Sequence, residues 1–213
     1  MNFIPHDYST LDKPEVLMNL FHPRHERWEK EGSESQEKEL LIPVEGDQLI
    51  GAKFHLSEPG NPVILFFHGN GEIVSDYDEI ALYYLKNGLS FLLAGYRGYG
   101  KSTGEPTASA MIQDSHTIFE YVKRWLEMNG YRGPIIVMGR SLGSASALEI
   151  SSKYQNEVSG LVIESGFAHT INLLSTLGIN TGKLGLKEEK GLRHMEKIKK
   201  FRKSLKEKIQ KIQ

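Results

Sequence analysis

The sequence predicts an α/β fold with a mainly parallel sheet that begins with antiparallel strands. From Pro62 onward, short apolar runs alternate with segments of helix length. Strands buried on both faces of a parallel sheet read as such continuous apolar runs. Before Pro62, two extended segments flank Glu45-Gly46-Asp47, as the strands of a hairpin flank their turn. Alternation of strand and helix then favours a sheet with right-handed crossovers.

The individual elements follow in order along the chain. Residues 12–30 hold a short helical pattern, and 29–39 are a polar run. The predicted antiparallel strands cover 40–44 and 49–55, and the predicted parallel strands cover 63–67, 90–94, 135–138 and 160–163. Helices are predicted over 80–86, 110–128 and 144–150. After Phe167 no strand is predicted, and apolar residues at helical spacing return from Leu192 onward.

A chain of 213 residues suits one domain better than two. We divide it into an N-terminal arm and linker (1–39), an α/β domain that lacks its last strands (40–203), and a basic helical tail (204–213). Residues 183–213 carry a net charge of +8 and the remainder −9. Such a tail suits a nucleic acid or an anionic membrane, but a solvated helix face is the commoner explanation, and we expect no nucleic-acid partner.

Composition excludes several classes of site. The absence of cysteine rules out disulfides, thiolate metal sites and a cysteine nucleophile. The first residues lack the basic start and apolar run of a signal peptide, and no apolar stretch approaches membrane-spanning length. We therefore expect a cytoplasmic protein without a membrane span.

Gly139-Arg140-Ser141-Leu142-Gly143 lies between a predicted strand and a predicted helix, which is the context that a G-x-S-x-G turn requires. Glycines on either side let the two backbones approach closely while the Ser141 hydroxyl projects outward. The start of the following helix favours the negative charge that develops in acyl transfer. Ser141 is therefore the candidate nucleophile.

A second candidate element, Phe66 to Glu72, follows an earlier strand. Its backbone can provide one N–H and Leu142 another, so that two donors face a tetrahedral oxyanion. Asn70 is the first choice for this loop donor and Gly69 the second. His68 is interpreted as a structural hydrogen-bonding residue beneath the loop.

The segment Gly95 to Ser102 matches the phosphate-loop pattern G-x-x-x-x-G-K-S after a strand. A phosphate loop needs a helix that begins at the lysine, so that its first amides face the phosphates. Thr103-Gly104-Glu105-Pro106 interrupts any such helix. Nucleotide hydrolysis is therefore the least favoured alternative.

Four segments in this order together resemble the α/β-hydrolase family, nearest to its bacterial esterase and serine-aminopeptidase-like branch: Phe66 to Glu72, Gly95 to Ser102, Gly139 to Ser144, and Glu164 to Phe167. The resemblance covers about 40–201 and implies a serine hydrolase. The family usually has aspartate where Gly95 stands. Its catalytic acid and histidine follow the serine along the chain.

Neither partner of the serine has a matching position here. By resemblance the acid would follow a strand that begins near Lys203, but the sequence continues as Lys-Ser-Leu-Lys-Glu-Lys and ends at Gln213. The available substitutes are His169, interpreted as a loop residue, His194, interpreted as a solvated helix residue, and Glu164. Arg140 has two open interpretations: it binds an anionic substrate group, or it is a surface residue.

The resemblance implies hydrolysis of an ester, thioester or small amide, without a metal or an organic cofactor. Ser141 would attack the carbonyl, and the backbone N–H groups of Leu142 and Asn70 would bind the oxyanion. The alternative is an inactive truncated hydrolase or an acyl-binding pseudoenzyme, because a serine without a base is a weak nucleophile. The expected partner is a small acyl substrate, together with self-association through the exposed sheet edge.

Overall fold

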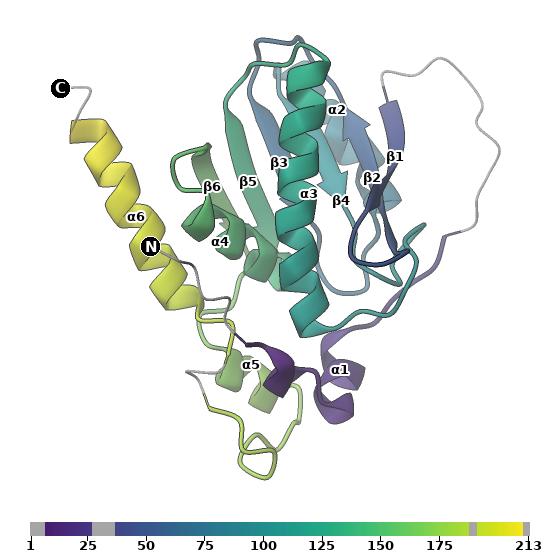
Figure 1. The fold of residues 1–213 in the computed structure, drawn as a ribbon, viewed down its shortest axis with the longest axis vertical. Helices are drawn as coiled ribbons and strands as arrows, with labels where there is room; N and C mark the ends of the chain where they lie inside the picture. Colours follow the sequence, from purple (N-terminus) through teal and green to yellow (C-terminus); the bar gives the residue numbers. More distant parts are fainter. Residues whose placement is uncertain (1–6, 27–36, 188–190, 211–213) are drawn as a thin grey trace.

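The computed structural model describes residues 7–26, 37–187 and 191–210, which build a six-stranded sheet with helices on both faces (Figure 1). The strands lie in the order β1-β2-β4-β3-β5-β6. β2 pairs antiparallel with both β1 and β4, and all the other neighbours are parallel. The predicted fold class, a mainly parallel sheet with an antiparallel start, is therefore confirmed.

The strands cover β1 Glu37–Pro43, β2 Leu49–His55, β3 Val63–Phe67, β4 Ser90–Ala94, β5 Ile135–Arg140 and β6 Val158–Glu164. The longer helices are α2 Asp78–Lys86, α3 Ala108–Met128, α4 Ser144–Lys153 and α6 His194–Gln210, and the short ones are α1 Pro14–Leu20 and α5 Thr170–Thr176. Single turns of 3-10 helix cover η1 Ser9–Leu11, η2 Val74–Tyr77 and η3 Ser141–Gly143. β1 begins inside the run predicted as linker, because Glu37 pairs with His55.

The central strand β3 shows how the two faces of the sheet are filled. Val63, Leu65 and Phe67 belong to the larger core cluster, which includes the buried faces of α3 and α4. Ile64 and Phe66 alternate with them and belong to a second cluster that α2 covers. All five residues are buried, so β3 carries both layers of the core.

The N-terminal segment packs against the body of the domain. Tyr8, Leu11, Val16, Leu20 and Phe21 all join the larger core cluster. In Figure 1 this segment and α5 lie together, below the end of the sheet where the parallel strands finish. The first residues of the described chain therefore border the end of the sheet at which Ser141 lies.

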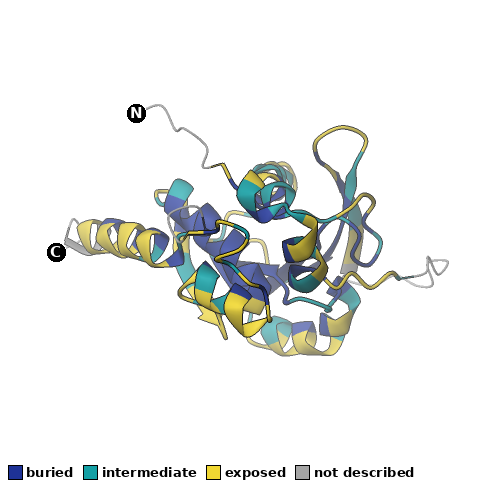
Figure 2. Cartoon of the chain, turned by 90° about the horizontal axis from the view of Figure 1, so that it is seen from below, coloured by how far each residue is buried: buried dark blue, intermediate teal, exposed yellow. Residues whose placement is uncertain are grey.

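The β6 side of the sheet is open. Within the described residues β6 pairs only with β5, and its side chains Val162 and Ile163 remain 43% and 36% exposed. Val162 lies opposite Met138, on the face that α2 covers farther along the sheet. Figure 2 shows α6 extending away from the rest of the fold with most of its surface exposed. An apolar strand edge of this kind is what the sequence predicted.

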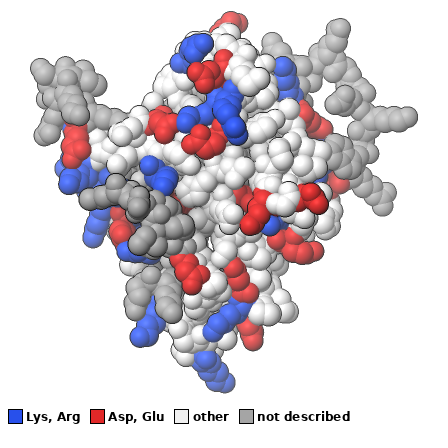
Figure 3. Space-filling view, viewed as in Figure 1, with Lys and Arg blue, Asp and Glu red and all other residues white. Residues whose placement is uncertain are grey.

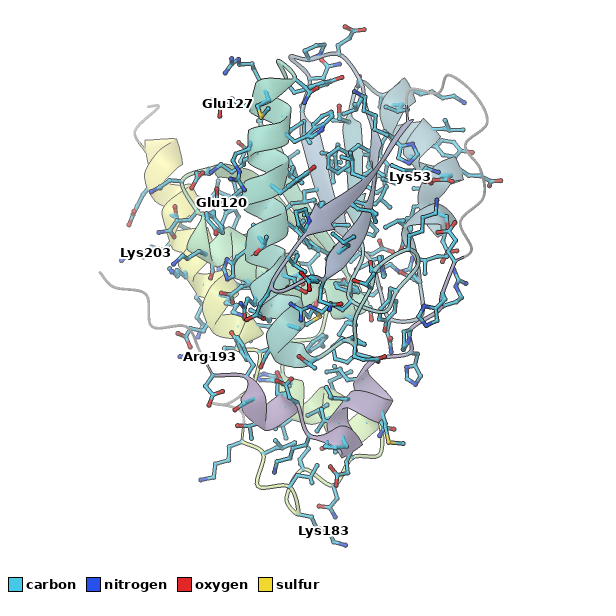
Figure 4. The ribbon with its side chains drawn as sticks, turned by 45° about the vertical axis from the view of Figure 1, so that its right-hand side comes forward. Lys53, Glu120, Glu127, Lys183, Arg193 and Lys203 are labelled. Carbon is cyan, nitrogen blue, oxygen red and sulfur yellow. The ribbon has the colours of Figure 1, made fainter. Side chains whose placement is uncertain are left out.

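Basic side chains follow α6, as the charge distribution of the sequence indicated. Lys199, Lys200, Arg202, Lys203 and Lys206 are exposed on this helix, and in Figure 3 blue side chains lie along the side of the molecule that α6 occupies in Figure 1. Figure 4 shows Arg193 near the start of α6 and Lys203 farther along it. Acidic groups are interspersed among them, as expected for a solvated helix face.

Candidate active site

Ser141 lies on the turn between β5 and α4. β5 ends at Arg140, and η3 leads directly into α4. The φ of Ser141 is 48°, in the left-handed region that side-chain-bearing residues seldom adopt. Such backbone strain is characteristic of functional turns. The residue is exposed, and the Ser144 hydroxyl donates to the Ser141 carbonyl oxygen over 2.6 Å, which stabilises the turn.

Two glycines make this turn sterically possible. A Cβ on Gly139 would overlap the carbonyl oxygen of Gly143, and a Cβ on Gly143 would overlap that of Phe67. The first contact brings strand and helix together, and the second places the turn against the end of β3. The spacing of glycines in the sequence therefore has a direct steric cause.

The loop that follows β3 carries Asn70. Because β3 and β5 are parallel neighbours, this loop and the Ser141 turn emerge at the same edge of the sheet. The Cβ position of Gly143 also lies 2.7 Å from the His68 carbonyl oxygen. The two residues predicted to bind an oxyanion therefore lie on adjoining segments. Asn70 is half-buried and Leu142 is buried.

Glu72 holds this loop in place. One of its carboxylate oxygens accepts hydrogen bonds from the Gly69 backbone N–H and the Tyr77 hydroxyl, each over 2.6 Å. Its other oxygen lies 3.2 Å from Nε of Arg140. Burial and the contact with Glu72 raise the pKa of Tyr77, so this phenol stays protonated and donates. Glu72 therefore connects the Asn70 loop to the residue before Ser141.

Arg140 bridges two carboxylates. Besides Glu72, its guanidinium lies 3.4 Å from Glu164 at the end of β6. The carboxylate of Glu72 is also the largest reason why the pKa of Arg140 is raised. These contacts favour a positioning role for Arg140 between β3 and β6. Glu164, a candidate acid, has its carboxylate directed to Arg140.

His68 has the structural surroundings that were predicted for it. The residue is fully buried, and its Nδ1 lies 2.8 Å from the Gly69 carbonyl oxygen. The Tyr96 hydroxyl donates to the carbonyl oxygen of His68 over 2.6 Å. Burial lowers its pKa to about 4. A neutral His68 therefore donates through Nδ1 to the loop that contains Asn70.

Gly95 to Ser102 does not have the conformation of a phosphate loop. No helix begins at Lys101, and the next one, α3, starts at Ala108. The Lys101 amine forms an ion pair with Glu39, and the Ser102 hydroxyl accepts a hydrogen bond from the Gly51 backbone N–H over 2.9 Å. The sequence match therefore corresponds to a packed structural loop.

His22 is a residue near the site that sequence reasoning missed. It follows α1 and contacts Asn70 through both its backbone and its imidazole. The segment was interpreted as part of an arm because its helical pattern is short. The signal available in the sequence was the apolar pair Leu20 and Phe21, whose burial fixes where His22 lies.

The two histidines after Ser141 have different environments. The interpretation of His194 as a solvated helix residue is wrong: it is 1% exposed, its Nδ1 contacts the Phe167 carbonyl oxygen, and burial lowers its pKa to about 4. It is buried because it begins α6 and packs on the Phe167 ring, 4.2 Å away between centroids. His169 is exposed, and both histidines line a cavity of about 400 Å³.

The described residues contain neither a candidate metal site nor a candidate membrane-spanning helix. Over 7–26, 37–187 and 191–210, no group of three or more histidine, cysteine or acidic side chains is arranged to hold a metal ion. None of the helices in these ranges has the length and apolarity needed to cross a membrane.

Comparison with known proteins gives the family. A family model described as serine aminopeptidase, S33, matches residues 58–186, well over half of the chain. The chain belongs to this α/β-hydrolase family. The match includes the Asn70 loop, the 95–102 loop and the Ser141 turn.

Individual relatives are more distant. Protein bem46 of Schizosaccharomyces pombe is 31% identical over 122 residues, 57% of this chain and 40% of its own. Lysophosphatidylserine lipase ABHD12 of Xenopus tropicalis is 27% identical over 113 residues, 51% of this chain and 28% of its own. The chain thus spans two fifths or less of these relatives' length. The crystal structure of an alpha-beta hydrolase from Vibrio vulnificus has a TM-score of 0.62 at 22% identity and covers 78% of this chain and 60% of its own, which supports the fold.

Proposed function

We propose that this chain carries the nucleophile half of a serine hydrolase site, with Ser141 as the nucleophile and the backbone N–H groups of Leu142 and Asn70 as oxyanion donors. The observation that carries this proposal is the exposed Ser141 at a φ of 48°, at the start of a helix and beside the Asn70 loop. A strained backbone that presents a hydroxyl at a strand–helix turn is the arrangement required of a G-x-S-x-G nucleophile.

The reaction would be acyl transfer to water. The Ser141 Oγ forms a bond to the carbonyl carbon and loses its proton to a base, and the carbonyl oxygen becomes an oxyanion. Collapse of this intermediate breaks the bond to the leaving group, which takes up a proton. Water then attacks the acyl-serine, regenerating the hydroxyl and releasing the acid. Donors aimed at the oxyanion typically contribute about 10²–10³-fold each to such a rate.

The proposed reaction requires a base that accepts the Ser141 proton. Of the residues that the structure describes, none hydrogen-bonds to the Ser141 hydroxyl. His169 is exposed at the cavity that it shares with His194, whereas His194 Nε2 is enclosed. His169→Ala is therefore the first substitution with which to look for a base in this chain.

We propose an ester, thioester or small amide as the substrate class. The relative named lysophosphatidylserine lipase supports an ester among these. Arg140 is already paired with two carboxylates, so we do not assign it to a substrate anion.

Because no base among the described residues hydrogen-bonds to the Ser141 hydroxyl, a second candidate is an acyl-binding protein without turnover. A serine hydroxyl at its ordinary pKa is a poor nucleophile. The two candidates differ in whether a covalent acyl-serine forms.

Hydrolysis of p-nitrophenyl acetate separates these functions. We expect wild-type protein to exceed the buffer rate and Ser141→Ala to fall to it. Ser175→Ala, which removes an exposed serine of α5, is the matched control and should retain the wild-type rate. Equal, negligible rates for wild type and Ser141→Ala in folded samples would contradict the hydrolase and favour the candidate without turnover.

We further propose that two copies of the chain associate through the free edge of β6. Unpaired strand edges with apolar side chains are templates for pairing with another chain. Val162 and Ile163 provide such side chains. Sedimentation velocity over a range of concentrations measures this association, and a monomer at all concentrations would exclude it.

A further inference from the structure

We infer that His22, on the N-terminal segment, positions the Asn70 backbone for oxyanion binding, so that this segment completes the active site. The inference rests on the proposed function, because it assigns a task to the Asn70 loop. Its basis is a set of contacts that joins parts of the chain 48 residues apart.

The Asn70 side chain is held on both of its polar atoms. Its Oδ1 accepts hydrogen bonds from the His22 backbone N–H over 2.8 Å and from the Tyr99 hydroxyl over 2.6 Å. Its Nδ2 lies 2.6 Å from Nδ1 of the His22 imidazole. Because an amide nitrogen can only donate, Nδ1 must accept, and the imidazole proton resides on Nε2. His22 therefore fixes which way the Asn70 amide faces.

Tyr99 joins the same network from the 95–102 loop. Its hydroxyl donates to Asn70 and accepts from the His22 backbone N–H over 2.9 Å and from the backbone of Gly71. The residue is buried, and burial raises its pKa to about 12, which keeps the hydroxyl protonated. Residues on two other segments, His22 and Tyr99, thus converge on Asn70.

The loop needs this support because of its own composition. Asn70 stands between Gly69 and Gly71, and Gly71 has a φ of 74°. Glycine allows many backbone conformations, so the direction of the Asn70 N–H is weakly determined by local geometry. Side-chain hydrogen bonds at Asn70 restrict it, which is how a donor is set in advance of the reaction.

The N-terminal segment stays in place without the His22 imidazole. Leu20 and Phe21 are buried in the main core. Beyond His22, the Gly100 backbone N–H donates to the Arg24 carbonyl oxygen over 2.8 Å, and Glu26 N–H donates to the Gly100 carbonyl oxygen over 3.1 Å. The Arg24 guanidinium also binds the Asp76 carboxylate. A substitution at His22 therefore tests the contact with Asn70 and not the docking of the segment.

The test is the rate at which a fluorophosphonate probe labels Ser141, since the phosphonyl oxygen takes the place of the oxyanion. We expect Ser141 of His22→Ala to be labelled about tenfold more slowly than Ser141 of wild type. This is less than the loss of about 10²–10³-fold in rate that follows complete removal of an oxyanion donor. His22→Asn should stay within about twofold, because its Oδ1 is as many bonds from Cβ as Nδ1 and accepts in the same place. His25→Ala, an exposed histidine on the same segment, should label at the wild-type rate.

Two further measurements separate positioning from general stability. The thermal midpoint of His22→Ala should stay within about 3 °C of wild type, the change that about 1 kcal/mol produces in a chain of this size. In an Asn70→Ala background, which keeps the backbone N–H but removes the side chain, His22→Ala should have no further effect on the rate.

The outcomes are distinct. A wild-type protein that is not labelled overturns the proposed function, and with it this inference. If wild type is labelled, three results overturn the inference and leave the proposed function standing. They are His22→Ala labelled as fast as wild type, His25→Ala labelled as slowly as His22→Ala, or His22→Ala unfolded.

Discussion

The two sides of Ser141 are held very differently. Toward β3, the turn contacts the Phe67 backbone, and Glu72, His68 and the Asn70 network fix the neighbouring loop. Toward β6, the strand edge is open and its apolar side chains are exposed. The closely packed half contains the proposed nucleophile and oxyanion donors, whereas the cavity of His169 and His194 is lined by residues that follow β6 along the chain. The close packing around the Ser141 turn therefore comes from β3 and its loop, and we expect the turn to depend less on β6.

The largest expected effect on stability is at Gly143, on the closely packed side of Ser141. Gly143→Ala should abolish cooperative folding or cost more than about 3 kcal/mol, because the new Cβ overlaps backbone atoms of Phe67 and His68 and the backbone itself would have to shift. Gly160→Ala on β6 is the control, since its Cβ would meet Ile136 at an ordinary 3.4 Å. Urea unfolding of both variants measures the contrast, and equal stabilities would refute it.

A second expectation concerns pH and the attachment of α6. Burial alone would raise the pKa of Glu149, but hydrogen bonds and charge from His116 and Lys197 hold it at about 2. Lys197 on α6 lies 2.5 Å from this carboxylate, and Tyr8 donates to it over 3.4 Å. Since the folded pKa lies below the unfolded one, near 4.5, the stabilisation is present above pH 4.5 and is lost as the pH falls toward 2.

The size of this contribution is at most about 3 kcal/mol, from about 1.4 kcal/mol per pKa unit. Burial lowers the pKa of Lys197, so the cost of burying its charge offsets part of this gain. Glu149→Gln should lower the free energy of unfolding at pH 7 and flatten its dependence on pH below 4.5. Burial lowers the pKa values of His68 and His194 from 6.5 to about 4. Both wild type and Glu149→Gln should therefore lose further stability as the pH falls from 6.5 to 4. Chemical unfolding at a series of pH values checks this, and parallel curves for wild type and Glu149→Gln would contradict it.

The third expectation is that the two carboxylates that contact Arg140 contribute differently to stability. Glu72→Gln should cost about 2 kcal/mol, because the Gly69 N–H and the Tyr77 hydroxyl lose a charged acceptor. Glu164→Gln, at the exposed end of β6, should stay within about 0.5 kcal/mol. Thermal unfolding of the pair decides between them. A larger loss for Glu164→Gln would mean that the β6 side supports the turn after all.

The smallest effect on stability is expected at the strand edge itself. Val162→Lys should change the free energy of unfolding by less than about 0.5 kcal/mol, because the side chain is already 43% exposed. The same substitution should shift the sedimentation of a self-associating sample toward monomer, since charges on an edge strand oppose pairing. Unchanged association would place the contact elsewhere.

Most of the fold could be predicted from the sequence because its signals are local. Continuous apolar runs such as 63–67 and 90–94 mark strands packed on both faces, and G-x-S-x-G between strand and helix marks the turn. The burial of His194 and the contact of His22 with Asn70 could not be predicted in this way. Both depend on packing between distant segments, Phe167 against α6 and residues 20–26 against the 95–102 loop.

The most direct test of the central claim is the reaction of intact protein with a fluorophosphonate, followed by mass spectrometry of the protein and its peptides. We expect a single adduct that maps to Ser141 and is absent from Ser141→Ala. A folded wild-type protein that forms no adduct, or one that carries it on another residue, would contradict the assignment of Ser141 as the nucleophile.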